Sequence, residues 1–224
     1  AEPQLKQLPP RTLDAAITLP FKEFFTRQGV LAALEILAFI FLFKLGDSLA
    51  TSLATKFYLD MGFSKTEIAI IAKNAGLWSG IAGGILGGIW MIRLGINRAL
   101  WIFGAAQLVV IPLFAWLSMA GHNPVVLGIV VGAEAFGVGL GTAAFVAFIA
   151  KTTNPLYTAT QLALLTALAA VPRTVINAYA GFMVDSLGWT NFFWICTALG
   201  IPGMLMLVRV APWHVAADNG QQKA

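Results

Sequence analysis

The sequence predicts an all-α membrane protein, a bundle of six transmembrane helices. Of its 224 residues, 58% are hydrophobic and 11% are charged, whereas soluble globular chains are about 45–50% apolar and about 25% charged. The apolar residues gather in six long runs, each close to the roughly 20 residues that a helix needs to cross a bilayer. A chain this apolar would expose large apolar patches in water, so the composition excludes a soluble globular fold.

The ends of the apolar runs carry capping signals that set the predicted helix boundaries. Ser64 and Glu67 have the spacing of a capping box, in which side chain and backbone of the first turn bond each other. Asn123 and Asn154 each precede a proline, so a good N-cap is followed by the residue preferred at the first helical position. We predict helices over residues 31–58, 66–91, 99–119, 124–150, 155–184 and 190–208.

The basic residues predict the orientation of the bundle. With both termini in the cytoplasm, that side holds nine Lys and Arg residues outside the helices, and the opposite side holds two, Lys56 and Lys65. This excess follows the positive-inside rule. The predicted organisation is a cytoplasmic linker at residues 1–29, a transmembrane domain at 30–210 and a cytoplasmic tail at 211–224. Phenylalanines alternate with charges near the end of the linker, which fits either a helix at the membrane interface or a solvated segment.

The polar residues exclude several function classes. The net charge is +4, but the basic residues are scattered and form no patch for nucleic acid. Cys196 is the single cysteine, and His122 and His214 stand far apart, so the sequence predicts no metal site and no cofactor. It contains no paired carboxylates and no nucleophile–base arrangement, so we predict that the protein is not an enzyme.

Glycines recur at every fourth position along the second predicted helix. They are Gly76, Gly80, Gly84 and Gly88. Three overlapping GxxxG steps of this kind line a helix face and let two backbones approach closely. Tight packing is the simpler interpretation. In a transporter, the same smooth face would also slide during a conformational change.

Five charged residues lie inside the apolar runs, where a charge costs roughly 2.5–3.5 kcal/mol on insertion scales. They are Lys44, Asp47, Lys73, Glu134 and Arg173. Charges at this depth normally face one another or a water-filled cavity, and they mark a pathway for a solute or an ion. A membrane anchor needs none of them, so the sequence predicts a transporter.

These five charges allow both structural and functional interpretations. Lys44 and Asp47 are three residues apart and are expected to pair on one helix face, either as a structural pair or as part of the pathway. Glu134 either carries a proton or hydrogen-bonds a neighbouring helix. Lys73 and Arg173 would give the cavity a net positive charge, which suits an anionic solute. Alternatively, Lys73 snorkels to the interface, and Arg173 binds carbonyl groups freed by the preceding proline.

Two loop signatures resemble those of the major facilitator superfamily. The first matches the motif G-x-x-x-D-R-x-G-x-x-R after the second helix, at Gly88, Arg93, Gly95 and Arg98. Ile92 replaces the aspartate of that motif. The second resembles the loop before a terminal helix, at Gly181, Phe182, Asp185, Gly188 and Trp189. The resemblance implies half of a major-facilitator fold, with Arg93, Gly95, Arg98 and Asp185 acting in its conformational change.

Three further strings resemble the muropeptide permease (AmpG-type) family of this superfamily. They are KLGD at residues 44–47, GLGTAAFVA at 139–147 and TQLALL at 160–165. The resemblance runs from residue 21 to residue 212 and aligns with the C-terminal half of these permeases. It implies proton-driven import of anhydro-muropeptides, the fragments of recycled peptidoglycan, across the bacterial inner membrane.

Together, the buried charges and the resemblance imply partners and site residues. The partners are the lipid bilayer, protons, an anionic small molecule and a complementary N-terminal six-helix half, in the same chain or a separate one. Glu134 would carry the proton, with Asp47 as the second candidate, and the substrate would bind at Arg173, Lys73, Lys44 and Gln161. Two alternatives stay open. One is transport of another anionic solute, such as a peptide, a sugar or an acyl-coenzyme A, and the other is a membrane assembly or sensor protein that transports nothing.

Overall fold

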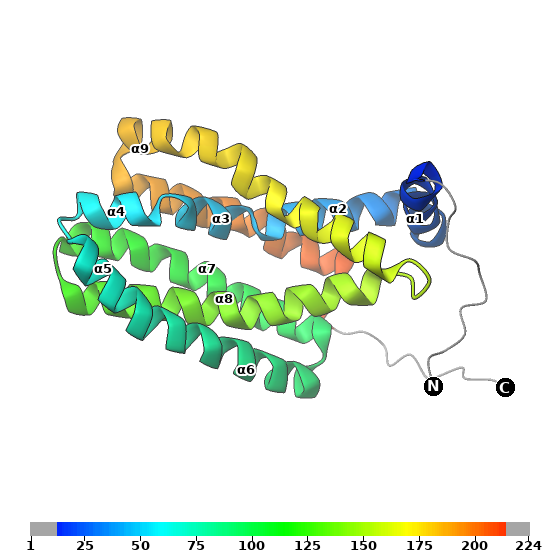
Figure 1. Ribbon diagram of the computed structural model, residues 1–224, viewed down its shortest axis with the longest axis horizontal. Coiled ribbons are helices and arrows are strands. Elements are labelled where there is room, and N and C mark those ends of the chain that lie inside the picture. The colour runs from blue at the N-terminus through cyan, green and yellow to red at the C-terminus, as the bar shows by residue number, and fades with distance from the viewer. Residues whose placement is uncertain (1–12, 214–224) are drawn as a thin grey trace.

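The described part of the chain is built of helices. The computed structural model describes residues 13–213, with side chains described for residues 18–171, 174 and 178–213. The elements in chain order are α1 (Leu13–Gln28), α2 (Val30–Phe43), α3 (Leu45–Ser52), α4 (Ala54–Asp60), α5 (Lys65–Ile71), the π-helix η1 (Ala72–Gly76), α6 (Leu77–Leu94), α7 (Ile96–Ala120), α8 (Pro124–Thr152) and α9 (Thr158–Val210). Most run along the long axis of the molecule, and α1 crosses it at one end (Figure 1). These residues contain no strand, so the predicted all-α class is confirmed.

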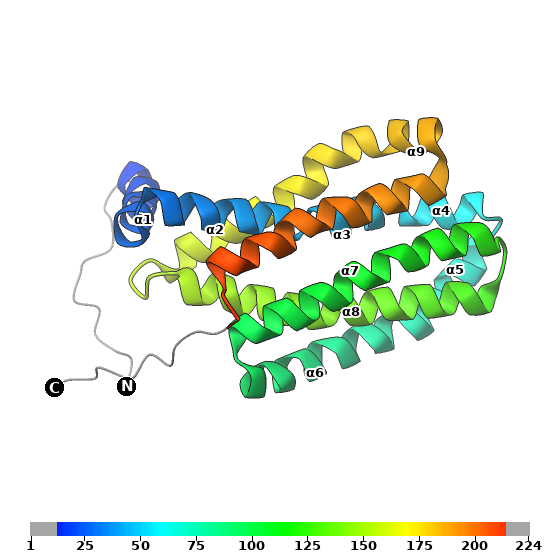
Figure 2. The ribbon, with the colours of Figure 1, turned by 180° about the vertical axis from the view of Figure 1, so that it is seen from behind.

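Helix α9 is folded back on itself at Gly188. This residue has φ +77° and ψ 163°, a backbone conformation that costs little only for glycine. Two arms result, residues 158–187 and residues 189–210, and the chain runs in opposite directions along them, so both arms extend from the turn toward the same end of the bundle (Figure 1, Figure 2). A chain reversal here is what the predicted boundary between the last two helices requires.

Several helices are long enough and apolar enough to cross a membrane. They are Lys65–Leu94, Ile96–Ala120, Pro124–Thr152 and Ala178–Val210. Thr18–Gln28 and Val30–Asp60 meet the same test only together, and they are bent by 110° where they join. The described residues therefore hold four candidate spans, or five if the bent pair is one span. The shorter apolar helix Thr158–Val171 lies in the first arm of α9. These lengths fit a multi-pass membrane protein.

The structure tests the predicted helix starts. The capping box is present, because Ser64 Oγ accepts from the Glu67 N–H at 3.2 Å and the Ser64 N–H donates to the Glu67 carboxylate at 2.8 Å. Asn123 caps α8 by accepting from two backbone N–H groups of the first turn. The prediction for Asn154 is wrong, because α9 begins at Thr158, three residues after the predicted start. Its side chain instead accepts an N–H inside the turn that precedes α9.

Two aromatic clusters fill the interior toward opposite ends of the bundle. In one, the ring centroids of Phe57 and Phe193 lie 4.8 Å apart. In the other, the centroids of Phe39 and Phe148 lie 5.2 Å apart. All four rings are buried. Between the two clusters lies a middle layer, and it holds Asp47 of α3 and Glu134 of α8.

Helix α6 packs on α8 through glycines that differ in part from the predicted set. A Cβ added at Gly83 would collide with the backbone of α8, and one added at Gly139 of α8 would lie 2.6 Å from a backbone oxygen of α6. Gly84 and Gly88 face open space rather than α8, and a packing role for these two stays a prediction. The reason is that an α-helix has 3.6 residues per turn, so a four-residue spacing rotates by about 40° per step. The glycines that face α8 are Gly76, Gly80, Gly83 and Gly87.

Candidate functional site

An open cleft lies in the middle layer between α3, α8 and the first arm of α9. It holds about 970 Å³ of empty space. Apolar side chains form much of its wall, and three of the five charges predicted inside the helices meet there. Its polar lining residues are Lys44, Asp47, Ser48, Thr51, Glu134 and Thr166.

Lys44 and Asp47 pair, as their spacing predicts. Lys44 Nζ lies 3.8 Å from Asp47 Oδ2, and the two side chains are 14% and 20% exposed. Helix α2 ends at Phe43 and α3 begins at Leu45, so the lysine occupies an interruption between two helices. Its ammonium also lies 5.7 Å from the centroid of the Phe145 ring, within the range of a cation–π interaction. The ammonium thus has a carboxylate and an aromatic face as neighbours.

Glu134 lies between the cleft and a second open groove. Its side chain lines the cleft and also an open groove of about 910 Å³ between α6 and α8. The described lining of the cleft therefore carries two carboxylates, Asp47 and Glu134, and one ammonium, Lys44. The net positive cavity expected from the sequence needs both Lys73 and Arg173; Lys73 does not line the cleft, and Arg173 lies in the first arm of α9 with its side chain outside the described residues.

The structure does not bring Lys73 and Gln161 to the cleft. Lys73 lies in η1 with its side chain exposed, and it does not line the cleft. Gln161 is 3% exposed and lies against α1 at the end of the bundle. Within the described residues, no three His, Cys, Asp or Glu side chains lie together in a way that would hold a metal ion.

A polar clamp holds α1 against the loop between α8 and α9 and against the start of α9. Its four side chains are Glu23, Arg27, Asn154 and Gln161. Glu23 Oε1 accepts from Arg27 Nε at 2.8 Å and from Asn154 Nδ2 at 2.6 Å, and Glu23 Oε2 accepts from Gln161 Nε2 at 2.7 Å. Burial alone would raise the pKa of Glu23, but these hydrogen bonds and the charge of Arg27 outweigh it and lower that pKa. The sequence gives no signal for the clamp, since Asn154 and Gln161 are 131 and 138 residues from Glu23.

The residues of the two loop motifs lie at the ends of helices. Gly95 joins α6 to α7 with φ +76°, which explains the need for glycine. Arg93 and Arg98 flank it and are both exposed. Asp185, near the end of the first arm of α9, accepts from Lys56 Nζ of α4 at 3.4 Å. The conformational role of these residues stays a prediction.

Comparison with known proteins finds bacterial relatives. No protein-family profile matches the chain. An uncharacterized protein of Haemophilus influenzae is 54% identical over 204 residues, which is 88% of this chain. The anhydromuropeptide permease of Escherichia coli K12 is 38% identical over 200 residues, or 89% of this chain. The chain is homologous to AmpG-type permeases. The putative transporter AmpG 4 of Rickettsia conorii, 38% identical over 189 residues, shows the same relationship.

The match to these permeases confirms the resemblance predicted from the sequence. It covers 84–89% of this chain for the two named relatives, yet the chain spans only 40% of the E. coli permease and 45% of the Rickettsia transporter. It spans 48% of the Haemophilus protein. The names of the AmpG-type relatives describe transporters rather than enzymes, in agreement with the predicted function class.

Proposed function

We propose that this chain is one half of a proton-coupled transporter that imports anhydromuropeptides across the bacterial inner membrane. The name of the E. coli relative, whose similarity covers 89% of the chain, supports the substrate. The observation that carries a transport function is the cleft, in which a lysine and two carboxylates lie together inside an apolar bundle. Ionisable groups inside a membrane are costly, and they mark the paths of ions and solutes.

The proposed half has six membrane segments and two cytoplasmic termini. The segments are α2–α4, α5–α6, α7, α8 and the two arms of α9. Helix α1, bent by 110° from the first segment, would lie at the cytoplasmic interface. Because the chain spans less than half of each named relative, a complementary N-terminal half, in the same chain or a separate one, would cover the open side of the cleft.

In the proposed mechanism, Glu134 carries the proton and Asp47 is the second candidate. In the second case, with the proton on Asp47, the charge that holds Lys44 would be removed, and the ammonium would become free to bind a carboxylate of the substrate. Arg173 would bind a second carboxylate through its bidentate fork. The two halves would then rock around this midplane site. Lys73 and Gln161 have no part in this mechanism, because they lie away from the cleft.

Uptake of labelled anhydromuropeptide into proteoliposomes tests the proposal. The chain is reconstituted alone and together with the complementary half, under an imposed inward proton gradient. We expect gradient-dependent uptake in the paired preparation, lost in Glu134→Gln and retained in Glu67→Gln. The second variant is a matched control, because Glu67 is a half-buried glutamate of the α5 capping box, away from the cleft, and glutamine can fill the same capping position.

Several outcomes would contradict parts of the proposal. Uptake that is independent of the gradient, or equal in Glu134→Gln and wild type, would remove Glu134 as the proton carrier. Absence of both uptake and binding in the folded paired protein would refute the muropeptide assignment. Competition by an unlabelled peptide, sugar or acyl-coenzyme A, stronger than that of muropeptide, would identify one of these as the substrate instead.

A further inference from the structure

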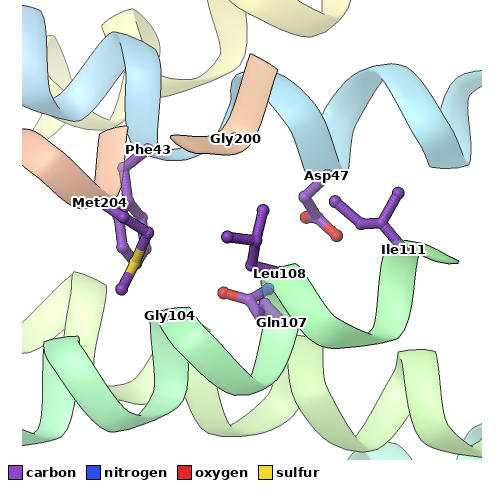
Figure 3. A pocket seen from close by; sticks show the side chains of 8 residues that line it. All are labelled: Phe43, Asp47, Gly104, Gln107, Leu108, Ile111, Gly200 and Met204. Atoms are coloured by element: carbon purple, nitrogen blue, oxygen red, sulfur yellow. The ribbon is translucent and has the colours of Figure 1, made fainter. Parts of the chain in front are cut away.

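A second, smaller pocket lies behind Asp47, between α3, α7 and the second arm of α9 (Figure 3). It contains about 290 Å³ of empty space, part of which is open to the outside. Asp47 extends into it from α3, and Gln107 extends into it from α7 (Figure 3). Asp47 therefore lines both the open cleft and this pocket. The same carboxylate is accessible from two sides.

Gln107 is a buried amide with an unused hydrogen-bond donor. The residue is 8% exposed, and its Nε2 is the one buried side-chain atom, among the residues that the structure describes, with no hydrogen-bond partner. Its Oε1 is packed so closely on Gly141 of α8 that an added Cβ there would collide with it. Buried polar atoms in folded proteins almost always have a partner, protein or water. The amide thus lacks an acceptor on the side of the pocket.

The pocket has the size and the chemistry of a water site. Glycines keep it open, because a Cβ at Gly104 would lie 2.6 Å from Met204 Sδ and one at Gly200 would lie 2.7 Å from Leu108 Cδ1. A water molecule occupies about 30 Å³ in the liquid and requires two to four polar partners. The pocket provides that space, together with the Gln107 donor and a carboxylate that accepts.

We propose that an ordered water molecule in this pocket bridges Gln107 Nε2 and the Asp47 carboxylate, and that Gln107 is thereby a positioning residue for Asp47. The water accepts from the amide and donates to the carboxylate. One carboxylate oxygen of Asp47 then faces Lys44 and the cleft, and the other accepts a hydrogen bond from the water in the pocket. The inference concerns a hydration site and the orientation of one side chain, so it stands whether or not the substrate and the proton coupling proposed above are right.

Transfer of NMR magnetisation from bound water to the Gln107 side-chain amide tests the bridge. The full chain is labelled with ¹⁵N at glutamine side chains, reconstituted in lipid nanodiscs, and the Gln107 signal is assigned by its loss in Gln107→Met. We expect a cross-peak between water and this amide in the wild type, its loss in Asp47→Leu, and its retention in Ser118→Ala. Ser118 is the control because it also lies in α7 but bonds Thr190, outside the pocket. A wild-type amide without contact to water, or a cross-peak unchanged in folded Asp47→Leu, would overturn the proposal.

An infrared measurement keeps the proposal testable if Asp47→Leu does not fold. The carboxylate stretching band of Asp47 is assigned with the conservative variant Asp47→Asn and then compared between the wild type and Gln107→Met. Loss of a hydrogen bond changes the carboxylate band, whereas a general loosening of the core does not select this one group. We expect the Asp47 band to shift in Gln107→Met and to stay in place in Ser118→Ala. An unshifted band in Gln107→Met would overturn the positioning role.

Discussion

Replacing Gly83 by alanine should force α6 away from α8. The added Cβ would collide with the backbone of Phe136, and a backbone cannot rotate out of the way as a side chain can. Gly84, the next residue of the same helix, has nothing within 4 Å of its Cβ position, so Gly84→Ala is a matched control. Alanine is favoured over glycine inside a helix by about 1 kcal/mol, but this gain is common to both variants and cancels in the comparison.

The difference between the two variants follows from the contact alone. Adding a carbon to a closely packed site typically costs about 1–3 kcal/mol, and the Gly83 site is closed by main-chain atoms. For a chain of this size, 1 kcal/mol changes the midpoint of thermal unfolding by about 2–4 °C. We therefore expect Gly83→Ala to unfold about 2–12 °C below Gly84→Ala.

Cys196 supplies the assay for this comparison. It is the single cysteine of the chain, and its side chain is fully buried. A thiol-reactive fluorescent dye therefore reacts only when the core opens, so heating the purified protein with the dye reports unfolding. Indistinguishable midpoints for Gly83→Ala and Gly84→Ala would refute the close approach of α6 and α8 at this glycine.

Three further changes test other contacts. Ser64→Ala should destabilise the start of α5 by about 1 kcal/mol, because it removes an acceptor of the capping box; faster hydrogen exchange in that turn, beside unchanged exchange in α8, is the expected readout. Acid should release α1, because the pKa of Glu23 is lowered in the folded protein. The stability that Glu23 contributes is therefore complete above its ordinary pKa of 4.5 and is lost as the pH falls through its lower pKa in the folded state. Hydrogen exchange of α1 should show this acid step in the wild type and lack it in Glu23→Gln; a step kept in that variant would assign it to another group. A double-mutant cycle of Lys44→Met and Asp47→Asn, measured with the Cys196 dye, should give a coupling of about 0.5–3 kcal/mol, and strictly additive effects would mean that these side chains do not interact.

The sequence predicted the start of a helix correctly where the capping contacts lie within its first turn. The spacing of Ser64 and Glu67 predicted a capping box, and Asn123 predicted a cap, because an N-cap depends on residues within the first turn. Asn154 shows the limit of this reasoning. Asparagine also closes turns by bonding its own backbone two residues on, and here its side-chain nitrogen additionally donates to Glu23 of α1.

Contacts of polar side chains inside the bundle were predictable only where charge or sequence spacing restricted them. The i, i+3 spacing of Lys44 and Asp47 was enough to predict their pair, and the cost of a buried carboxylate was enough to single out Glu134. Gln161 was singled out by its place in a motif, yet its amide binds α1. Gln107 was missed, because one neutral amide in an apolar run has neither a charge nor a partner at helical spacing. Only the packing of α7 against α3 and α8 buries Gln107 and places it in the same pocket as Asp47.

The site lies beside the break between α2 and α3. Lys44 stands between α2 and α3. Two residues later, Gly46 lies close to the backbone of the second arm of α9, because a Cβ added at Gly46 would be 2.9 Å from the Gly200 nitrogen. Backbones that meet at glycines leave few side chains to fill the layer, so a cleft and a pocket flank Asp47. The aromatic clusters toward the two ends of the bundle are close-packed, and repacking them would be costly. In the proposed transporter, proton uptake by Glu134, or by Asp47 as the second candidate, therefore acts on the layer that can move while both clusters stay intact, and this layer is where it would be converted into helix movement.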